Sequence, residues 1–407
     1  MTSFFTWLDY SERERRKMLD AIALFREQDT RDELGIGIIR DAFADLLFPG
    51  TSTIQRRARY FLFVPWIYLR LEKQGVSSSE IAERARSKEI ALINVLAESE
   101  DSEGTIGVVA RASLKRLPSN IYWQGLGQWG IRLFPGSQEQ YHRSLDSFYS
   151  SARRSTRENE EDSFDERTSR NWQYGIPNAP SDFPRNISFT LTAAEAEYLQ
   201  ERIMSQVPKT LLAFLVDRGR VSEQVAFPWE HHQLGEFPDH IQEQLEHARN
   251  FSDAIHGAAL LYNLMLAEES DSREKIDHYN KRIQHWFKSL ELRRESLFVW
   301  NRKRFWEIVG SEGARIPPLT RIFVDSWLDL AFASRSSRHI ISNNKARDLL
   351  FKREIALKRG LARLDNKRAL ELWSGAAGTE PLNYRWQVSQ IIILDILKGL
   401  SEGESHA

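Results

Sequence analysis

Hydrophobic residues recur at intervals of three and four positions along most of the chain, which is the spacing of one face of an α-helix. Within residues 11–28, for example, Met18, Ile22 and Phe25 follow this spacing. Strand signals are few, and the best of them are the short segments 130–134 and 187–191. The pattern predicts a mainly α, multi-helical protein, made of two helical domains with few short strands.

Capping and turn residues set the limits of the predicted helices. Ser77 with Glu80, and Thr192 with Glu195, have the spacing of a capping box at a helix start. The predicted helices cover residues 11–28, 38–48, 51–74, 77–99, 108–117, 191–218, 238–269, 274–309, 319–334, 343–361, 365–372 and 384–400.

A charged, proline-containing segment divides the chain. Eleven of the twenty residues in 151–170 are charged, and Pro177, Pro180 and Pro184 follow. Such a composition is typical of an exposed, partly disordered connection. We therefore expect an N-terminal helical domain at 1–150, a linker at 151–185 and a C-terminal helical domain at 186–407.

The most distinctive stretch is 46–68, LLFPGTSTIQRRARYFLFVPWIY. From residue 60 onward it is apolar on all sides, as expected of a buried helix, and Pro65 should kink that helix. Before residue 60 it carries three arginines close to the expected helix start, where the helix dipole is positive. Something must compensate their charge.

Two explanations account for these arginines. In the structural one, Asp41 and Asp45, which lie on one face of the preceding helix, form an ion cluster with them. In the functional one, the arginines and the hydroxyls at the helix start bind a phosphate of a nucleic-acid backbone. The residues of this candidate site are Thr51, Ser52, Arg56, Arg57 and Arg59.

A second candidate nucleic-acid interface follows. Residues 75–94, continuing through 105–116, have the outline of a helix-turn-helix, in which Arg111, Lys115 and Arg116 would contact phosphates. Any helical hairpin has a similar outline, so the plain alternative is a structural hairpin.

Two aromatic segments allow both a structural and a functional interpretation. In 118–129, Tyr122, Trp123 and Trp129 surround two glycines and would either fill the core or stack on an unpaired base. In 286–306, six aromatic residues are mixed with cationic ones that include Arg293, Arg294, Arg302, Lys303 and Arg304. This segment would either bury its aromatics and solvate its cations, or present a face to nucleic acid or an acidic partner.

No residue pattern predicts catalysis or a cofactor. Without cysteine, no zinc–thiolate site or cysteine nucleophile can form. His231, His232, His240 and His247 are the densest group of histidines, but their spacing matches no compact metal site. Arg273 and His278 have the R-x4-H spacing of a helical class of ribonucleases, which chance alone would produce in this chain. We therefore expect no catalytic residue, metal or cofactor.

Charge and hydropathy narrow the class of protein. The 407 residues include 56 Lys and Arg and 57 Asp and Glu, which argues against a wholesale polyanion binder and leaves room for a local basic face. The N-terminus lacks the pattern of a signal peptide, and the longest apolar run is far shorter than a membrane span. We expect a soluble, cytoplasmic protein with no membrane partner.

Four segments together resemble a bacterial family of unknown function. They are residues 43–73, SNIYWQGLGQWGI at 119–131, RLDNKRALELWSGAAG at 363–378 and LNYRW at 382–386. The resemblance spans nearly the whole chain and implies an association with antiviral-defence genes near helicases and nucleases. It implies no catalytic residues.

The expected function is a non-enzymatic component of a bacterial defence or DNA-processing system. It would bind DNA or RNA, a helicase or nuclease encoded nearby, or both. The alternatives are an unrecognised nuclease or other hydrolase, and a purely structural protein-interaction scaffold.

Overall fold

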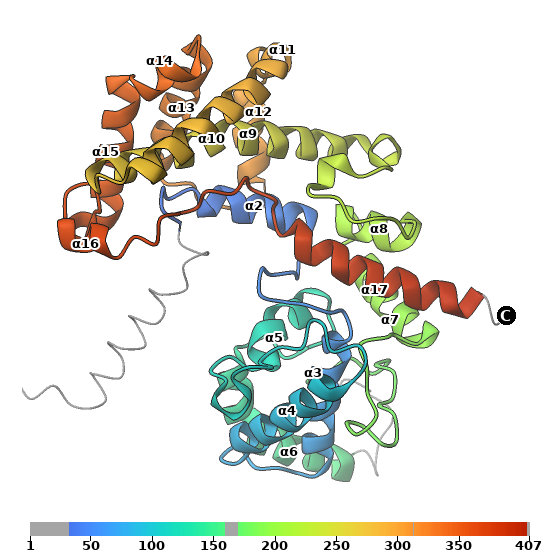
Figure 1. Cartoon of the computed structure of the whole chain (residues 1–407). Helices are drawn as coiled ribbons and strands as arrows, with labels where there is room; N and C mark the ends of the chain where they lie inside the picture. Colours follow the sequence, from blue (N-terminus) through green and yellow to red (C-terminus); the bar gives the residue numbers. More distant parts are fainter. Residues whose placement is uncertain (1–31, 159–169, 312, 405–407) are drawn as a thin grey trace, which may run out of the picture. The chain divides into compact units, whose positions relative to one another are not determined.

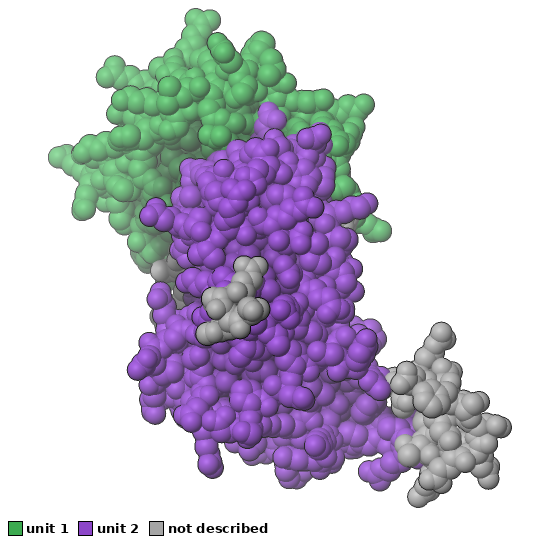
Figure 2. Space-filling view, turned by 90° about the vertical axis from the view of Figure 1, so that its right-hand side faces the viewer, with its two compact units in different colours: residues 1–42, 247–382 green, residues 43–246, 383–407 purple. Residues whose placement is uncertain are grey.

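The computed structural model describes residues 32–158, 170–311 and 313–404. The chain forms two compact units, coloured separately in Figure 2. Unit 1 is made of Met1–Ala42 and His247–Leu382, and unit 2 of Phe43–Glu246 and Asn383–Ala407. The predicted division at 1–150, 151–185 and 186–407 follows chain order, whereas each unit combines segments that are distant in sequence.

The prediction of a mainly α, multi-helical protein is confirmed (Figure 1). In the described residues the strand signal is limited to one isolated bridge between Arg132 and Trp172. The helices of unit 2 are α3 (Tyr60–Lys73), α4 (Ile81–Glu98), α5 (Pro118–Gln128), α6 (Gln138–Glu158), α7 (Ala193–Gln206), α8 (Leu211–Arg218) and α17 (Trp386–Glu404). The helices of unit 1 are α10 (Arg273–Leu292), α11 (Arg294–Phe298), α12 (Arg302–Gly310), α13 (Pro318–Ala333), α14 (Ser337–Ile341), α15 (Asn344–Lys358) and α16 (Lys367–Glu371). Helices α2 (Gly37–Leu47) and α9 (Asp239–Glu269) contain residues of both units.

Helix α3 is the centre of the first part of unit 2. Its residues from Tyr60 to Tyr68 are all buried, and Pro65 lies inside the helix, as predicted. Helices α4 and α5 pack against it. Further along the chain, α17 packs along α7 and α8, which joins the two sequence segments of unit 2 (Figure 1). The capping box of Thr192 and Glu195 forms at the start of α7, as predicted.

The prediction that a helix starts at Thr51 or Ser52 is wrong, because α3 begins at Tyr60. Polar side chains hold the residues before it in turns. The Gln55 side chain accepts a hydrogen bond from the Ser52 amide and donates one to Gly50 O at 3.1 Å. Thr51 Oγ1 donates to Phe48 O at 2.7 Å. These local bonds compete with helix formation, as short polar side chains commonly do.

The predicted helix-turn-helix does not form. After α4, the expected helix at 108–117 is a loop with one short 3-10 turn, η1 (Arg111–Ser113). Gly107 and Arg111 have positive φ, which no α-helix contains. The Arg86 guanidinium donates to Ala112 O and Leu114 O and so holds this irregular backbone. The predicted capping box of Ser77 and Glu80 is also wrong, since neither side chain caps α4.

The described part of the segment 151–185 is exposed at some positions, such as Tyr174, and packs into unit 2 at others. Trp172 and Phe183 are buried in unit 2. Backbone carbonyls of this segment accept hydrogen bonds from α3: Trp66 Nε1 donates to Pro177 O at 2.7 Å, and Arg70 donates to Phe183 O. The charged residues 159–169 and the predicted helix at 11–28 lie outside the described residues.

In unit 1 the predicted helix 274–309 is divided into α10, α11 and α12. The breaks occur where side chains bond across the unit instead of continuing the helix. Trp300 Nε1 donates to His247 Nδ1 of α9 at 2.7 Å, and the Asn301 side chain caps α12. The corner between α10 and α11 is therefore a distinct feature of the surface.

Candidate functional site

The arginines of 50–59 are mostly neutralised by carboxylates of unit 2. Arg57 forms ion pairs with Asp101 at 2.8 Å and Asp395 at 3.0 Å. Arg59 Nη2 pairs with Glu195 Oε1 at 2.7 Å, and its Nη1 donates to Ser188 O. A phosphate would have to compete with these bonds.

The structural explanation is therefore correct in kind but wrong in its partners. Asp45 pairs with Arg385 at 2.6 Å, and Asp41 pairs with Arg40. The carboxylates that neutralise Arg57 and Arg59 come from the 99–110 loop, α7 and α17, far away in sequence. No local spacing could have identified them.

The remaining residues of this candidate site diverge in exposure. Thr51 is buried, and its hydroxyl donates a hydrogen bond to Phe48 O. The Ser52 hydroxyl is also buried and has no hydrogen-bond partner in the described structure. Arg56 has an exposed side chain. Arg56 is thus the one cation of the five candidate residues that faces solvent.

The second candidate interface is an exposed loop of unit 2. Arg111, Lys115 and Arg116 are all exposed, and Arg111 Nη1 donates to Asn94 Oδ1 at 2.9 Å. Val109 at the tip is exposed as well. The predicted cations are therefore on the surface, although they lie on a loop and not on a recognition helix.

The aromatic segment 118–129 fills the core, as its structural interpretation predicted. Tyr122, Trp123 and Trp129 are buried. The Trp129 ring stacks on Phe61 with centroids 3.8 Å apart, and its Nε1 donates to Pro49 O at 2.9 Å. A buried ring offers no platform to a base.

Glycine is required where α5 crosses the turn before α3. A Cβ at Gly125 would lie 2.3 Å from the backbone oxygen of Gly50, a contact that only a backbone shift could relieve. Gly125 and Gly50 thus allow α5 and this turn to approach closely, so that the Trp129 side chain can reach Pro49 O.

The histidines are dispersed. His247 accepts from Trp300, and His240 contacts Lys209 O. The His231 and His232 rings lie 4.4 Å apart. In the part of the chain that the structure describes, no three His, Asp or Glu side chains are grouped as metal ligands would be.

A buried polar chain links α3, α4, α5 and α6. The Glu89 carboxylate of α4 is fully buried and accepts hydrogen bonds from Ser119 N at 2.8 Å and Ser119 Oγ at 2.7 Å. Gln138 donates to Ser119 Oγ and to Tyr68 OH, which in turn contacts His142 Nε2 at 3.0 Å. Burial raises the pKa of the Glu89 carboxyl to about 7, because desolvation of the charged form outweighs the two bonds from Ser119.

This buried carboxyl should make the stability of unit 2 depend on pH. Since its folded pKa of about 7 exceeds the ordinary value of 4.5, the folded state binds the extra proton. Its contribution to stability is complete below pH 4.5 and is lost as the pH rises through 7. We expect the melting temperature of Glu89→Gln relative to the natural protein to rise between pH 4.5 and pH 8. The exposed Glu83→Gln variant on the same helix is the control, and an unchanged difference across this range would contradict the prediction.

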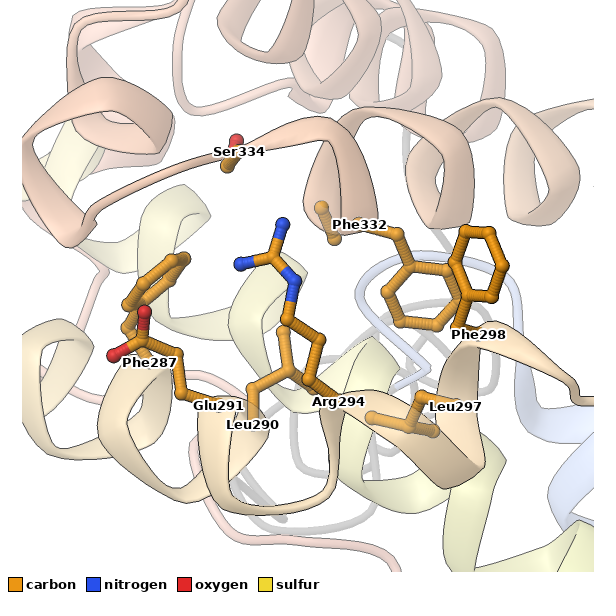
Figure 3. Close-up of a pocket in the computed structure, with 9 residues that line it drawn as sticks. Phe287, Leu290, Glu291, Arg294, Leu297, Phe298, Phe332 and Ser334 are labelled. Atoms are coloured by element: carbon orange, nitrogen blue, oxygen red, sulfur yellow. The ribbon is translucent and has the colours of Figure 1, made fainter.

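Unit 1 contains a pocket of about 170 Å³ between α10, α11 and α13 (Figure 3). Its lining is mainly apolar, and Arg294 and Glu291 add opposite charges. Arg294 rises between Phe287 and Phe332, and its guanidinium is directed toward Ser334 (Figure 3). The lining residues are Phe287, Leu290, Glu291, Arg294, Leu297, Phe298, Ala331, Phe332 and Ser334.

Three large apolar side chains that line this pocket or directly follow a lining residue in sequence are exposed. Leu292, Phe298 and Val299 are 89%, 87% and 79% exposed. They lie where α10 ends and the five-residue α11 follows, so they are turned away from the core that the other aromatics of 286–306 fill. We call the surface formed by Leu292, Arg294, Phe298 and Val299 the α10–α11 corner.

Comparison with known proteins establishes the family. The model of DUF6361, a family of unknown function, matches residues 2–397. The chain belongs to this family. The match covers nearly the whole chain and confirms the resemblance inferred from the sequence. No curated protein and no solved structure gives a significant match.

For this member of DUF6361, the predicted site residues do not form one site. Those of 51–59 are largely built into unit 2, and those of 111–116 lie on a separate loop. The sequence did not indicate the α10–α11 corner, although Phe298 lies within the segment considered for an acidic partner. Among the described helices, none has the length and apolar character needed to cross a membrane.

Proposed function

We propose that the protein is a non-enzymatic adaptor that binds a partner protein at the α10–α11 corner. The observation that carries this proposal is the exposure of Leu292, Phe298 and Val299 beside a concave apolar pocket. Exposed large apolar side chains grouped near a pocket are typical of protein-interaction sites. Large aromatic side chains, which dominate the binding free energy of many interfaces, are present there as Phe298 and Phe332.

The proposed setting is a bacterial antiviral-defence or DNA-processing system, in the cytoplasm. The partner would be a helicase or nuclease encoded nearby, as the family resemblance implies. The adaptor role is favoured over a hydrolase because Arg57 and Arg59 are engaged in ion pairs and the described histidines are dispersed.

Co-expression with the neighbouring gene products tests this proposal. We expect one of them to co-purify with the full chain, and the Phe298→Ser, Val299→Ser double variant to weaken the complex by more than tenfold. The control is Tyr174→Ser, which removes an exposed aromatic ring from unit 2. Equal co-purification of the double variant would contradict the proposal.

Nucleic-acid binding is the second candidate function, supported by the exposed cations Arg56, Arg111, Lys115 and Arg116. Labelled DNA and RNA, with and without magnesium, separate the alternatives. Retention of the nucleic acid without cleavage supports this candidate, and cleavage supports a hydrolase. If the nucleic acid is neither retained nor cleaved, the adaptor function remains. If the loop binds phosphates, Arg111→Ala with Arg116→Ala should reduce the salt slope by about two. Arg143→Ala, at an exposed arginine of α6, is the control.

A further inference from the structure

We infer that the pocket of the α10–α11 corner receives one apolar side chain of a partner segment and that Arg294 pairs with a carboxylate beside it in that segment. This inference rests on the proposed adaptor function and specifies the chemistry of its partner. Size, lining and charge each support it.

The size of the pocket suits a single side chain. Its volume of about 170 Å³ is close to that of cavities, about 150 Å³, that bind one benzene ring. The rings of Phe287 and Phe332 and the aliphatic side chains of Leu290 and Leu297 form much of its walls. An aromatic or branched aliphatic side chain would fill this space and bury its surface there.

The charge of Arg294 is available to a ligand. In the described structure its guanidinium forms no ion pair or hydrogen bond, and the side chain is exposed at the pocket. The neighbouring arginines differ: Arg293 pairs with Asp253, Arg302 with Asp329 and Arg304 with Glu307. A planar guanidinium next to an apolar pocket is well suited to a carboxylate, which it can bind through two parallel hydrogen bonds.

The surrounding charge adds little to this preference. Residues 288–304 contain six cations and two carboxylates, but Arg293, Arg302 and Arg304 are paired with carboxylates outside this span. Glu291 on the other side of the pocket disfavours a second acidic group there, so it would orient the bound segment.

A protein segment fits these features better than a membrane. A lipid surface is broad and would be met by a convex apolar face, whereas this pocket is concave and holds one side chain. We therefore commit to a peptide segment with an aromatic or large aliphatic residue flanked by Asp or Glu.

Selection from a random peptide library tests the inference. The library is selected on the full chain and counter-selected on Phe298→Ser, so that enriched peptides depend on the corner. We expect an aromatic or large aliphatic residue next to Asp or Glu in the enriched sequences. Arg294→Gln should then lower the affinity of such a peptide about fivefold, while Lys288→Gln, the same charge change outside the pocket, should alter it less than twofold.

The outcomes separate the two proposals. If peptides depend on Phe298 but carry no acidic residue, or bind Arg294→Gln unchanged, the inference is overturned and the adaptor function stands. If no selected peptide depends on Phe298, and the Phe298→Ser, Val299→Ser variant co-purifies with the partner as the natural protein does, both the inference and the adaptor function are overturned. If the protein binds phosphatidylserine vesicles and Phe298→Ser abolishes this binding, the ligand of the corner is a membrane. If the protein self-associates in light scattering and Phe298→Ser abolishes this association, the ligand is a second copy of the chain. Either result would overturn the inference.

Discussion

Replacing Arg59 with alanine is expected to lower the free energy of unfolding of unit 2 by about 3–5 kcal/mol. Arg59 and Glu195 are 5% and 4% exposed, and their ion pair measures 2.7 Å. The substitution leaves the Glu195 carboxylate buried without its cation, which costs far more than the loss of an exposed pair. Guanidinium denaturation followed by circular dichroism measures the effect.

The matched control is Arg56→Ala, three residues away. Its side chain is exposed, so its effect on unfolding should stay within about 0.5 kcal/mol. A second variant, Arg59→Met with Glu195→Gln, removes both charges and should recover part of the loss. A loss below about 1 kcal/mol in Arg59→Ala would show that the pair is not buried as described.

The second large effect is expected from Trp129→Ala, which should cost unit 2 about 3–5 kcal/mol. The ring is fully buried, stacks on Phe61 and donates to Pro49 O, so its removal leaves a cavity and an unsatisfied carbonyl. Thermal unfolding followed by circular dichroism measures the loss.

Trp129→Phe keeps a ring against Phe61 and should lose less, while the exposed Tyr174→Ala should be nearly neutral. A different result for Trp129→Ala would support the alternative in which Trp129 stacks on a base. In that case Trp129→Ala would leave stability unchanged and weaken the binding of single-stranded nucleic acid.

Local sequence patterns predicted much of the helical fold. The apolar run from Tyr60 to Tyr68 correctly indicated a buried helix, and Thr192 with Glu195 correctly indicated a helix start. Both predictions depend on residues within one or two turns of each other. Hydrophobic periodicity and capping chemistry therefore carried this information.

The same patterns failed where distant groups decide the conformation. Periodicity predicted a helix through 51–59, but the Gln55 side chain and the distant carboxylate Asp395, which accepts from Arg57 and from Ala58 N, hold these residues in turns. Similarly, 274–309 is interrupted where Trp300 bonds to His247. Such partners are separated by tens to hundreds of residues, and a helical period contains no record of them.

The candidate sites show the same division. That Arg57 and Arg59 require anions was predictable from their position, whereas the identity of those anions was not. The pocket beside Arg294 depends on how α13 packs near α10 and α11, which no spacing within one helix expresses. The exposure of Phe298 could not be predicted either, because most other apolar residues of 286–306 are buried and nothing in the sequence distinguishes Phe298 from them.

The pairing of α17 with α7 and α8 has a consequence for synthesis of the protein. A ribosome makes the chain in order, so residues 43–246 emerge long before α17, and all of 247–382 is made between them. Until α17 arrives, the apolar surface of α7 and α8 lacks its cover and Arg57 lacks Asp395. Unit 2 therefore cannot complete its folding before α17 has been synthesised. A nascent chain paused before residue 383 should therefore bind chaperones, and a chain in which α17 has also emerged should lose that dependence.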